Sequence, residues 1–398
     1  MIIAYLEIGL LLLALHPKFI NMKIIVLGAG LVGGPMAIDL VKDEEFEVSI
    51  ADINPVSFEY LQSFGIKTIQ QDLSNPQTVK EIVSAYDMAI NAVPGFMGFQ
   101  TLKAIIEAGK NVVDIAFFPE DPFTLDELAK KNNVIAVMDC GVAPGMMHIL
   151  TGYVHHLLDE TETAITYVGG LPEIREYPYE YKAVFSPIDV VEEYTRPARY
   201  IENHKLVIRE ALSDPELINF AGIGTLEAFN SDGIRSLGQT IKAANIKEKT
   251  LRYPGHISLM KVLRETGFFS QEELEVKGMK IKPMDVTAKL LFPMWELKKG
   301  ERDLTIMKVI VEGIKDGKKL RYTYDLLDRY DEETQTHSMA RTTGYTATVA
   351  LRMIANGLYT QKGLSVPEYI GKYPECVEFM LSELAARGIN YIETIEEI

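Results

Sequence analysis

A short loop near the start of the chain carries three glycines at a fixed spacing, Gly28, Gly30 and Gly33. It follows the apolar run Ile24–Leu27 and precedes Pro35–Val41, whose apolar residues recur at helical spacing. In such a loop the first glycine allows a tight turn, the second lets the backbone approach a pyrophosphate, and the third lets helix and strand pack closely. The helix N-terminus then offers free N–H groups to the phosphates. The pattern predicts a dinucleotide site.

An acid at the end of the next expected strand bears on the choice of dinucleotide. Asp52 lies close to the roughly 20-residue spacing after Gly28 at which an acid binds ribose hydroxyls. Its charge repels a 2′-phosphate, and Ile53, Asn54 and Pro55 supply no arginine to receive one. We therefore expect NAD rather than NADP as the cofactor.

Short apolar runs alternate with helical segments between Met22 and Gly145. We expect strands at residues 23–27, 48–51, 67–70, 88–92, 112–115 and 134–138. This alternation predicts an α/β fold with a doubly wound parallel sheet of the Rossmann type. Ligands bind beyond the carboxyl ends of such strands. Besides the glycines and Asp52, the expected cofactor-binding residues are therefore Leu31, Val32, Asp72, Leu73, Val93, Pro94 and Gly145.

The pattern changes after Gly145. We expect a helix at 146–158, strands that begin at 164–168 and are broken by Gly169–Pro172, and a loop rich in Tyr and Pro at 173–181. Alternating runs at 304–312 and 319–326 predict a second α/β domain whose sheet is largely antiparallel. The expected divisions of the chain are residues 22–145, 146–340 and a C-terminal helical segment, 341–398.

The composition excludes several classes of function. The 398 residues are 47% apolar and 24% charged, as in ordinary globular proteins, and the formal charge of −16 disfavours nucleic acid or an anionic membrane as a partner. Two cysteines, Cys140 and Cys376, suit a reducing cytoplasm. No HExxH motif, cysteine pair or carboxylate cluster predicts a metal site.

Residues 1–21 are largely apolar. The stretch is short for a membrane span, which needs about 20 apolar residues, and it lacks the basic region of a signal peptide. We expect Met22 to be the natural start of the protein, with a membrane-associated extension as the alternative.

Several motifs together carry a family resemblance. They are Gly28-Ala-Gly-Leu-Val-Gly33, Gly141-Val-Ala-Pro-Gly145, Tyr167-Val-Gly-Gly-Leu-Pro172, Phe185-Ser-Pro187, Glu193-Tyr-Thr-Arg-Pro-Ala198, Phe229-Asn-Ser-Asp-Gly233 and Tyr253-Pro-Gly-His256. From Met22 onward the chain resembles the saccharopine dehydrogenase-like family, and most closely its lysine 6-dehydrogenase branch.

The resemblance implies a Rossmann domain, a substrate-binding and dimerisation domain, and C-terminal helices that return towards the first domain. It also implies a homodimer that uses NAD to oxidise the ε-amine of L-lysine. The expected product is 2-aminoadipate 6-semialdehyde, which closes to the cyclic imine 1-piperideine-6-carboxylate while ammonia is released.

That reaction needs a base, because hydride leaves the carbon only when the ε-amine is neutral. His256 is the first candidate, although a histidine in a turn often serves packing alone. Asp114, at the end of the fifth strand, either binds the ε-ammonium or caps a turn. Tyr181 is expected to cover the site and exclude water. We interpret Cys140 as a buried thiol, because the chemistry needs no covalent step.

The substrate also carries charges that the site must bind. An arginine is the best partner for the α-carboxylate, and Arg199, Arg235 and Arg341 are the candidates. Glu193 and Asp139 are candidates for the amines, and each has a purely structural alternative as an ion-pair or buried residue.

Two other functions stay open on sequence grounds. One is saccharopine dehydrogenase or a polyamine-forming reductase of the same family. Saccharopine carries a glutarate arm with two more carboxylates, so its site needs more cations. The other is a non-catalytic NAD-binding protein.

Overall fold

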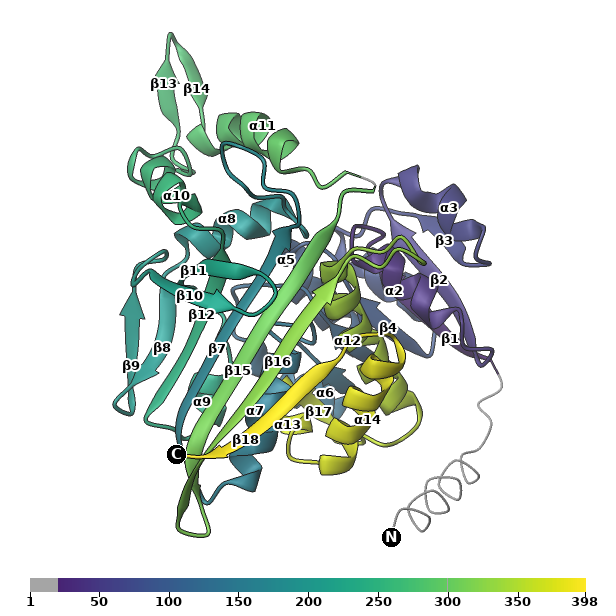
Figure 1. Cartoon of the computed structure of the whole chain (residues 1–398). Helices are drawn as coiled ribbons and strands as arrows, with labels where there is room; N and C mark the ends of the chain where they lie inside the picture. Colours follow the sequence, from purple (N-terminus) through teal and green to yellow (C-terminus); the bar gives the residue numbers. More distant parts are fainter. Residues whose placement is uncertain (1–20, 299) are drawn as a thin grey trace.

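The computed structural model describes residues 21–298 and 300–398 (Figure 1). The expectation for residues 1–21 falls almost wholly outside this part of the chain. Within it, no helix is both long enough and apolar enough to cross a membrane.

The first domain is built on a sheet of seven parallel strands in the order β17-β6-β5-β4-β1-β2-β3. Its strands are β1 (Met22–Leu27), β2 (Phe46–Asp52), β3 (Lys67–Gln70), β4 (Met88–Asn91), β5 (Asn111–Asp114), β6 (Ile135–Val137) and β17 (Gly363–Ser365). The six strands expected from the sequence are confirmed. The parallel Rossmann sheet is likewise confirmed.

Helices cover both faces of this sheet, because side chains of the central strands point alternately to the two sides. In β1, Ile24 and Val26 pack in the core on one side and Ile25 and Leu27 in the core on the other. The connecting helices are α2 (Gly33–Leu40), α3 (Phe58–Gln62), α4 (Pro76–Val83), α5 (Gly95–Glu107), α6 (Asp126–Lys131) and the 3₁₀ helices Pro55–Ser57 and Pro122–Leu125. The carboxyl edge of the sheet faces a cavity that residues of α8 (Pro187–Thr195) and α12 (Ser338–Ala355) help to line.

The second domain contains a nine-stranded sheet in which only β7 and β12 run parallel. Its strands are β7 (Glu160–Pro172), β8 (Ala198–Glu202), β9 (Lys205–Arg209), β10 (Glu216–Phe220), β11 (Gly224–Asn230), β12 (Asn245–Arg252), β15 (Asp303–Lys315), β16 (Lys318–Arg329) and β18 (Tyr391–Glu397). The largely antiparallel character of this sheet is confirmed.

Part of the second domain, from α10 (His256–Glu265) to α11 (Pro283–Trp295), forms an arm that projects from the body of the molecule (Figure 1). The other helices of this domain are α7 (Met146–Leu157), α8 (Pro187–Thr195) and α9 (Leu237–Thr240). The hairpin of β13 (Leu274–Val276) and β14 (Met279–Ile281) forms the tip of the arm, between α10 and α11.

The expected break after residue 168 is wrong, because β7 continues through Gly169 and Gly170 to Pro172. A methyl group on Gly169 would lie 2.8 Å from Leu251, and one on Gly170 would lie 2.5 Å from Met339. These glycines therefore serve close packing, of Gly169 against β12 and of Gly170 against Met339, rather than a turn.

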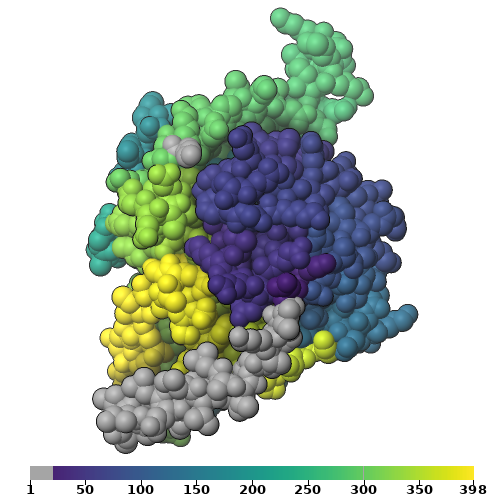
Figure 2. Space-filling model, turned by 90° about the vertical axis from the view of Figure 1, so that its right-hand side faces the viewer, coloured from purple at the N-terminus to yellow at the C-terminus, as the bar shows by residue number. Residues whose placement is uncertain are grey.

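The C-terminal segment returns to the first domain, as expected, but it is not only helical (Figure 2). Its helices are α12 (Ser338–Ala355), α13 (Pro367–Ile370) and α14 (Pro374–Ala386). In addition, β17 pairs with β6 at the edge of the first sheet, and β18 pairs with β16 at the edge of the second. The three residues of β17 are too few for a periodic signal, and the alternation in β18 is hidden by its acidic, exposed residues.

One buried carboxylate joins this returning segment to the nucleotide domain. Asp39 on α2 accepts hydrogen bonds from Thr348 (2.6 Å), Arg352 (2.6 Å) and Arg387 (2.8 Å). Burial alone would raise the pKa of Asp39, but the two guanidinium groups lower it below its ordinary value.

We predict that Asp39→Asn lowers the free energy of unfolding by about 1.5–3 kcal/mol, because it removes the most buried counter-charge of Arg352 and Arg387, which keep only Asp43 and Glu383 as ion-pair partners in the described part of the chain. Urea unfolding measures the change, and Asp43→Asn, which removes a more exposed partner of Arg352, is the milder control. A carboxylate with a depressed pKa stabilises the fold above its ordinary pKa and loses that contribution as the pH falls through the folded value. The gap between wild type and Asp39→Asn should therefore close in acid. A gap that is constant with pH would contradict this account.

Candidate active site

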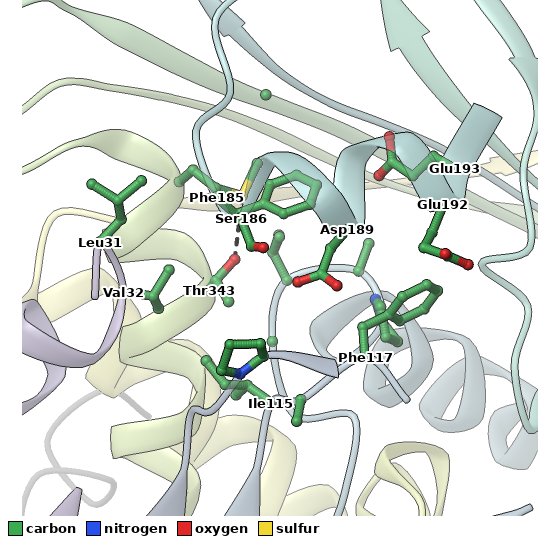
Figure 3. A pocket seen from close by; sticks show the side chains of 18 of the residues that line it. Leu31, Val32, Ile115, Phe117, Phe185, Ser186, Asp189, Glu192, Glu193 and Thr343 are labelled. Atoms are coloured by element: carbon green, nitrogen blue, oxygen red, sulfur yellow. Dashed lines mark hydrogen bonds between the residues drawn. The ribbon is translucent and has the colours of Figure 1, made fainter. Parts of the chain in front are cut away.

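A cavity of about 460 Å³ lies between the carboxyl edge of the first sheet and the second domain (Figure 3). The glycine loop and the residues after β4 and β5 form one wall. The opposite wall consists of α8, the middle of β7, the loop after β11 and the end of β12, while Met339 and Thr343 of α12 close one side. The cavity is thus the place where a cofactor on the first domain would meet a substrate on the second.

The glycines of the loop have the environments that a pyrophosphate site requires. Gly28 has a φ of +107°, and a methyl group on it would lie 2.5 Å from the carbonyl oxygen of Ala92. A methyl group on Gly33 would lie 2.0 Å from the carbonyl oxygen of Gly28. Gly30 instead faces the cavity, with no atom within 4 Å of the place where its methyl group would stand. The N-terminus of α2 has no side-chain cap, which leaves it available to a phosphate.

Asp52 lies at the end of β2 beside this loop and lines the cavity. Its two oxygens accept hydrogen bonds from the backbone N–H groups of Ala29 (2.7 Å) and Asn54 (2.8 Å). These bonds fix the carboxylate against the glycine loop and leave lone pairs for two ribose hydroxyls. The residues present therefore fit a nicotinamide dinucleotide.

The other expected cofactor residues divide into two groups. Leu31, Val32, Val93 and Pro94 line the cavity. The remaining three do not: Asp72 accepts a hydrogen bond from the N–H of Ser74, Leu73 is buried in the core, and Gly145 is packed against Gly141.

All three expected arginines bind carboxylates of the protein itself. Arg199 donates two hydrogen bonds to Asp232, at 2.7 and 2.9 Å. Arg341 donates to Asp328 at 3.1 Å and to a backbone carbonyl oxygen at 2.8 Å. Neither arginine lines the cavity, so the structure does not bring them to a substrate.

The third arginine is paired with another expected substrate residue. Arg235 donates two hydrogen bonds to Asp139, at 2.7 and 3.1 Å, and both side chains are buried outside the cavity lining. Asp114, fully buried nearby, accepts hydrogen bonds from Asn91 and Ala116. Burial raises the pKa of Asp114 well above its ordinary value. These carboxylates hold the scaffold together, and the structure places neither on the cavity surface.

His256 is sealed among aromatic rings and does not line the cavity. Its Nδ1 lies 2.8 Å from the carbonyl oxygen of Tyr179, and its Nε2 lies 3.0 Å from the hydroxyl of Tyr194. Burial and the nearby charge of Arg252 lower the pKa of His256 to about 3. In this position the imidazole holds Tyr194 rather than meeting a substrate amine.

Tyr181 is also buried rather than placed as a lid. Its hydroxyl has no hydrogen-bond partner within the described residues, and its ring lies 4.5 Å from the guanidinium carbon of Arg252. Burial raises the pKa of Tyr181 well above its ordinary value. Tyr181 is connected to the site through its contact with Arg252, and His256 is connected through Tyr194, whose hydroxyl accepts a hydrogen bond from Arg252.

Arg252 and Glu193 form the part of this network that reaches the cavity. Arg252 donates to Glu193 at 2.6 Å and to the hydroxyl of Tyr194 at 3.1 Å. Burial raises the pKa of Glu193, although the charge of Arg252 opposes the rise. Among the expected substrate-binding residues, Glu193 is thus the one that lines the cavity.

Sequence reasoning missed two further acids on the same helix. Asp189, Glu192 and Glu193 all lie on α8 and all line the cavity (Figure 3). Their spacing of i, i+3 and i+4 puts them on one face of a helix. This signal was present in the sequence, but such a face is as easily interpreted as solvated.

The missed residues beyond these are Glu248, Arg196, Asp232 and Arg252. Glu248 is buried in the cavity wall and accepts hydrogen bonds from Ser231 (2.6 Å) and the N–H of Gly233 (3.2 Å). Burial raises its pKa to about 8, against the effect of the Ser231 hydrogen bond. Arg196 lines the cavity, packs on the ring of Phe117 and keeps one terminal nitrogen buried without a hydrogen-bond partner in the described part of the chain.

No cluster of three or more histidine, cysteine or acidic side chains that is suited to hold a metal occurs among the described residues. The charged groups that line the cavity are carboxylates and the arginines Arg196 and Arg252, beside the nucleotide loop.

Comparisons with known proteins agree with this architecture. Residues 24–137 match the model of the saccharopine dehydrogenase NADP binding domain, and residues 141–389 match that of the saccharopine dehydrogenase C-terminal domain. The solved apo saccharopine dehydrogenase (L-Glu forming) from Saccharomyces cerevisiae has the same fold, with a TM-score of 0.76 at 18% identity over 94% of this chain and 100% of that one.

Several curated proteins are also similar to this chain, at sequence identities of 23–25%. The chain is 25% identical to saccharopine dehydrogenase [NADP(+), L-glutamate-forming] of Schizosaccharomyces pombe, over 94% of this chain and 99% of that protein. It is 23% identical to carboxyaminopropylagmatine dehydrogenase of Synechocystis, over 94% and 98%. The match to the mitochondrial alpha-aminoadipic semialdehyde synthase of Mus musculus, at 24% identity, covers 63% of this chain but only 29% of that protein. The chain belongs to the saccharopine dehydrogenase family of oxidoreductases.

Proposed function

We propose that the protein oxidises the ε-amine of L-lysine with NAD, releasing ammonia and 2-aminoadipate 6-semialdehyde, which closes to 1-piperideine-6-carboxylate. One observation carries the proposal. The second-domain wall of the cavity presents five acidic side chains, Asp189, Glu192, Glu193, Asp232 and Glu248. Three of them have arginine partners, and burial raises the pKa of Glu248 to about 8, so among the described residues Asp189 is the acid whose negative charge is left unpaired.

This balance of charge suits a substrate with more ammonium groups than carboxylates. L-Lysine carries two ammonium groups and one carboxylate, whereas saccharopine adds two carboxylates on its glutarate arm. In a cavity of low polarity, each unpaired like charge is costly. An excess of carboxylates therefore favours lysine over saccharopine.

Different side chains of the cavity are suited to different charged groups of the substrate. Arg196, with its unpartnered nitrogen, is suited to the α-carboxylate, whereas the nitrogens of Arg252 donate to Glu193, Tyr194 and a backbone carbonyl oxygen. The carboxylates of α8 are suited to the ammonium groups. Phe117 and Phe185 line the cavity between the two walls and limit the entry of water (Figure 3). A bound NAD supplies the acceptor for the hydride that leaves the carbon of the neutral amine.

A second candidate is the polyamine-forming reductase considered from the sequence. The Synechocystis relative is named for a substrate that contains agmatine, and an acid-rich cavity also suits a guanidinium group. The homodimer and the cytoplasmic location expected from the sequence stay predictions.

The choice of NAD rests on Asp52 and on the absence of a basic residue in the segment that follows it. The name of the matching nucleotide domain and those of several relatives mention NADP. A carboxylate fixed at the ribose site nevertheless repels a 2′-phosphate.

We predict that the wild-type protein binds NAD more tightly than NADP. Asp52→Ser should weaken NAD binding by about 10- to 100-fold, through lost hydrogen bonds to a charged group, and should narrow the difference from NADP. Titration of protein fluorescence with each dinucleotide measures both affinities. The matched control is Asp72→Ser, which removes the acid after the neighbouring strand and should change neither affinity. Tighter binding of NADP by the wild type would contradict the assignment.

We predict that L-lysine and NAD give NADH and ammonia in equal amounts. The rate should rise with pH, because the fraction of neutral ε-amine grows as the pH approaches the pKa of that amine, near 10.4. Absorbance at the NADH band and an ammonia assay measure the two products. Saccharopine and carboxyaminopropylagmatine serve as competing substrates in the same assay. Faster turnover of either would assign the protein to the alternative function, and NAD binding without turnover of any amine would indicate a non-catalytic role.

A further inference from the structure

Asp189 differs from the other acids of the cavity in what surrounds its carboxylate. Glu192 pairs with Arg196, Glu193 with Arg252 and Asp232 with Arg199. Asp189 accepts a hydrogen bond from Ser186 but has no ion-pair partner within the described residues. It is therefore a carboxylate whose charge is left for a ligand.

The position of Asp189 is at the nucleotide side of the cavity. It lies in the first turn of α8, and a methyl group on Gly95, the first residue of α5, would lie 3.3 Å from its Oδ1. Figure 3 shows the Asp189 side chain between Ser186 and Phe117, directed into the cavity. The carboxylate therefore reaches across from the second domain to the carboxyl ends of β4 and β5.

This end of the cavity is where we expect the carbon of the substrate that loses hydride, next to the nicotinamide. Asp52, on the β2 side of the glycine loop, would hold the ribose nearer the adenine. Because β4 is the neighbour of β1 on the other side, the residues after β4 and β5 would then hold the nicotinamide end of a bound dinucleotide. Pro94 and Phe117 line this part of the cavity beside Asp189.

Resting on the function proposed above, we propose that Asp189 is a catalytic residue that binds the ε-ammonium group of the substrate and accepts its proton. The proton moves from the ammonium nitrogen to the Asp189 carboxylate, and the amine becomes neutral. A bound NAD would accept the hydride from the ε-carbon of this neutral amine, which would leave an iminium ion. Addition of water to the iminium carbon gives a carbinolamine, a proton moves from the added oxygen to the nitrogen, and the nitrogen leaves as ammonium while the aldehyde forms.

The electrostatic surroundings favour this role. Burial raises the pKa of Asp189, the hydrogen bond from Ser186 lowers it, the charge of Glu192 raises it and Arg196 lowers it. Glu193 also faces Asp189 from the same helix. The net rise brings the carboxyl closer to the working pH, where a base is most effective.

The test is Asp189→Asn, with Asp285→Asn as its matched control. Both aspartates lie in the first turn of a helix, two residues after a proline that begins it, but Asp285 is exposed and does not line the cavity. With L-lysine and NAD at pH 8, Asp189→Asn should lower kcat by about 100-fold or more. NAD affinity and the melting temperature should not change, and Asp285→Asn should behave as wild type.

The pH dependence separates a base from a residue that only shapes the site. Without the carboxylate, the variant depends on amine that is already neutral in solution, and that fraction grows as the pH nears 10.4. The ratio of wild-type to Asp189→Asn kcat/KM should therefore fall as the pH rises, and Asp189→Glu should restore part of the activity.

Two results overturn the role of Asp189 alone: wild-type-like turnover by Asp189→Asn, or a loss of activity that is constant across the pH range. An inactive wild-type protein, by contrast, overturns the proposed function and this inference with it. Loss of NAD binding in Asp189→Asn assigns the residue to cofactor binding instead.

Discussion

The buried ion pair between Asp139 and Arg235 determines how the two domains meet. Asp139 follows β6 in the first domain, and Arg235 follows β11 in the second. Two charges removed so completely from water are tolerated only when they are paired and fully hydrogen-bonded, so the pair restricts the approach of the domains to one geometry. The guanidinium group also packs on Phe117, which lines the cavity. The contact that joins the domains thus shapes the wall of the site.

The same constraint explains the unequal distribution of charge in the cavity. Arginines near the interface are bound to protein carboxylates, and their positive charge is held in place by the scaffold. Acids on α8 exceed the cations available to them. In a space enclosed by Phe117, Phe185 and the glycine loop, a surplus of negative charge acts at short range and selects by the charge of the ligand. Specificity then depends on charge balance as much as on shape.

Local patterns of the sequence predicted the fold well. The glycine loop, the strands of the first sheet and Asp52 depend on neighbouring residues, so their signals are contained in short windows. The candidate substrate residues depended on distant partners. The motif that ends in His256 gives no sign of the burial of the imidazole, because Tyr179 and Tyr194 come from elsewhere in the chain. The pairing of Arg199 with Asp232 is likewise invisible before folding. The acidic face of α8 was readable from its spacing, but the cavity that makes it functional was not.

The strand β17 has a consequence for how the protein is made. It completes the edge of the first sheet beside β6, yet it follows eight of the nine strands of the second sheet along the chain. During synthesis, which adds about 5–20 residues per second, the strands β1 to β6 emerge long before their last neighbour. Until residue 365 is available, the edge of β6 presents unpaired backbone groups of the kind that recruit foreign strands. The sheet of the nucleotide domain therefore stays incomplete at one edge until β17 is synthesised near the end of translation.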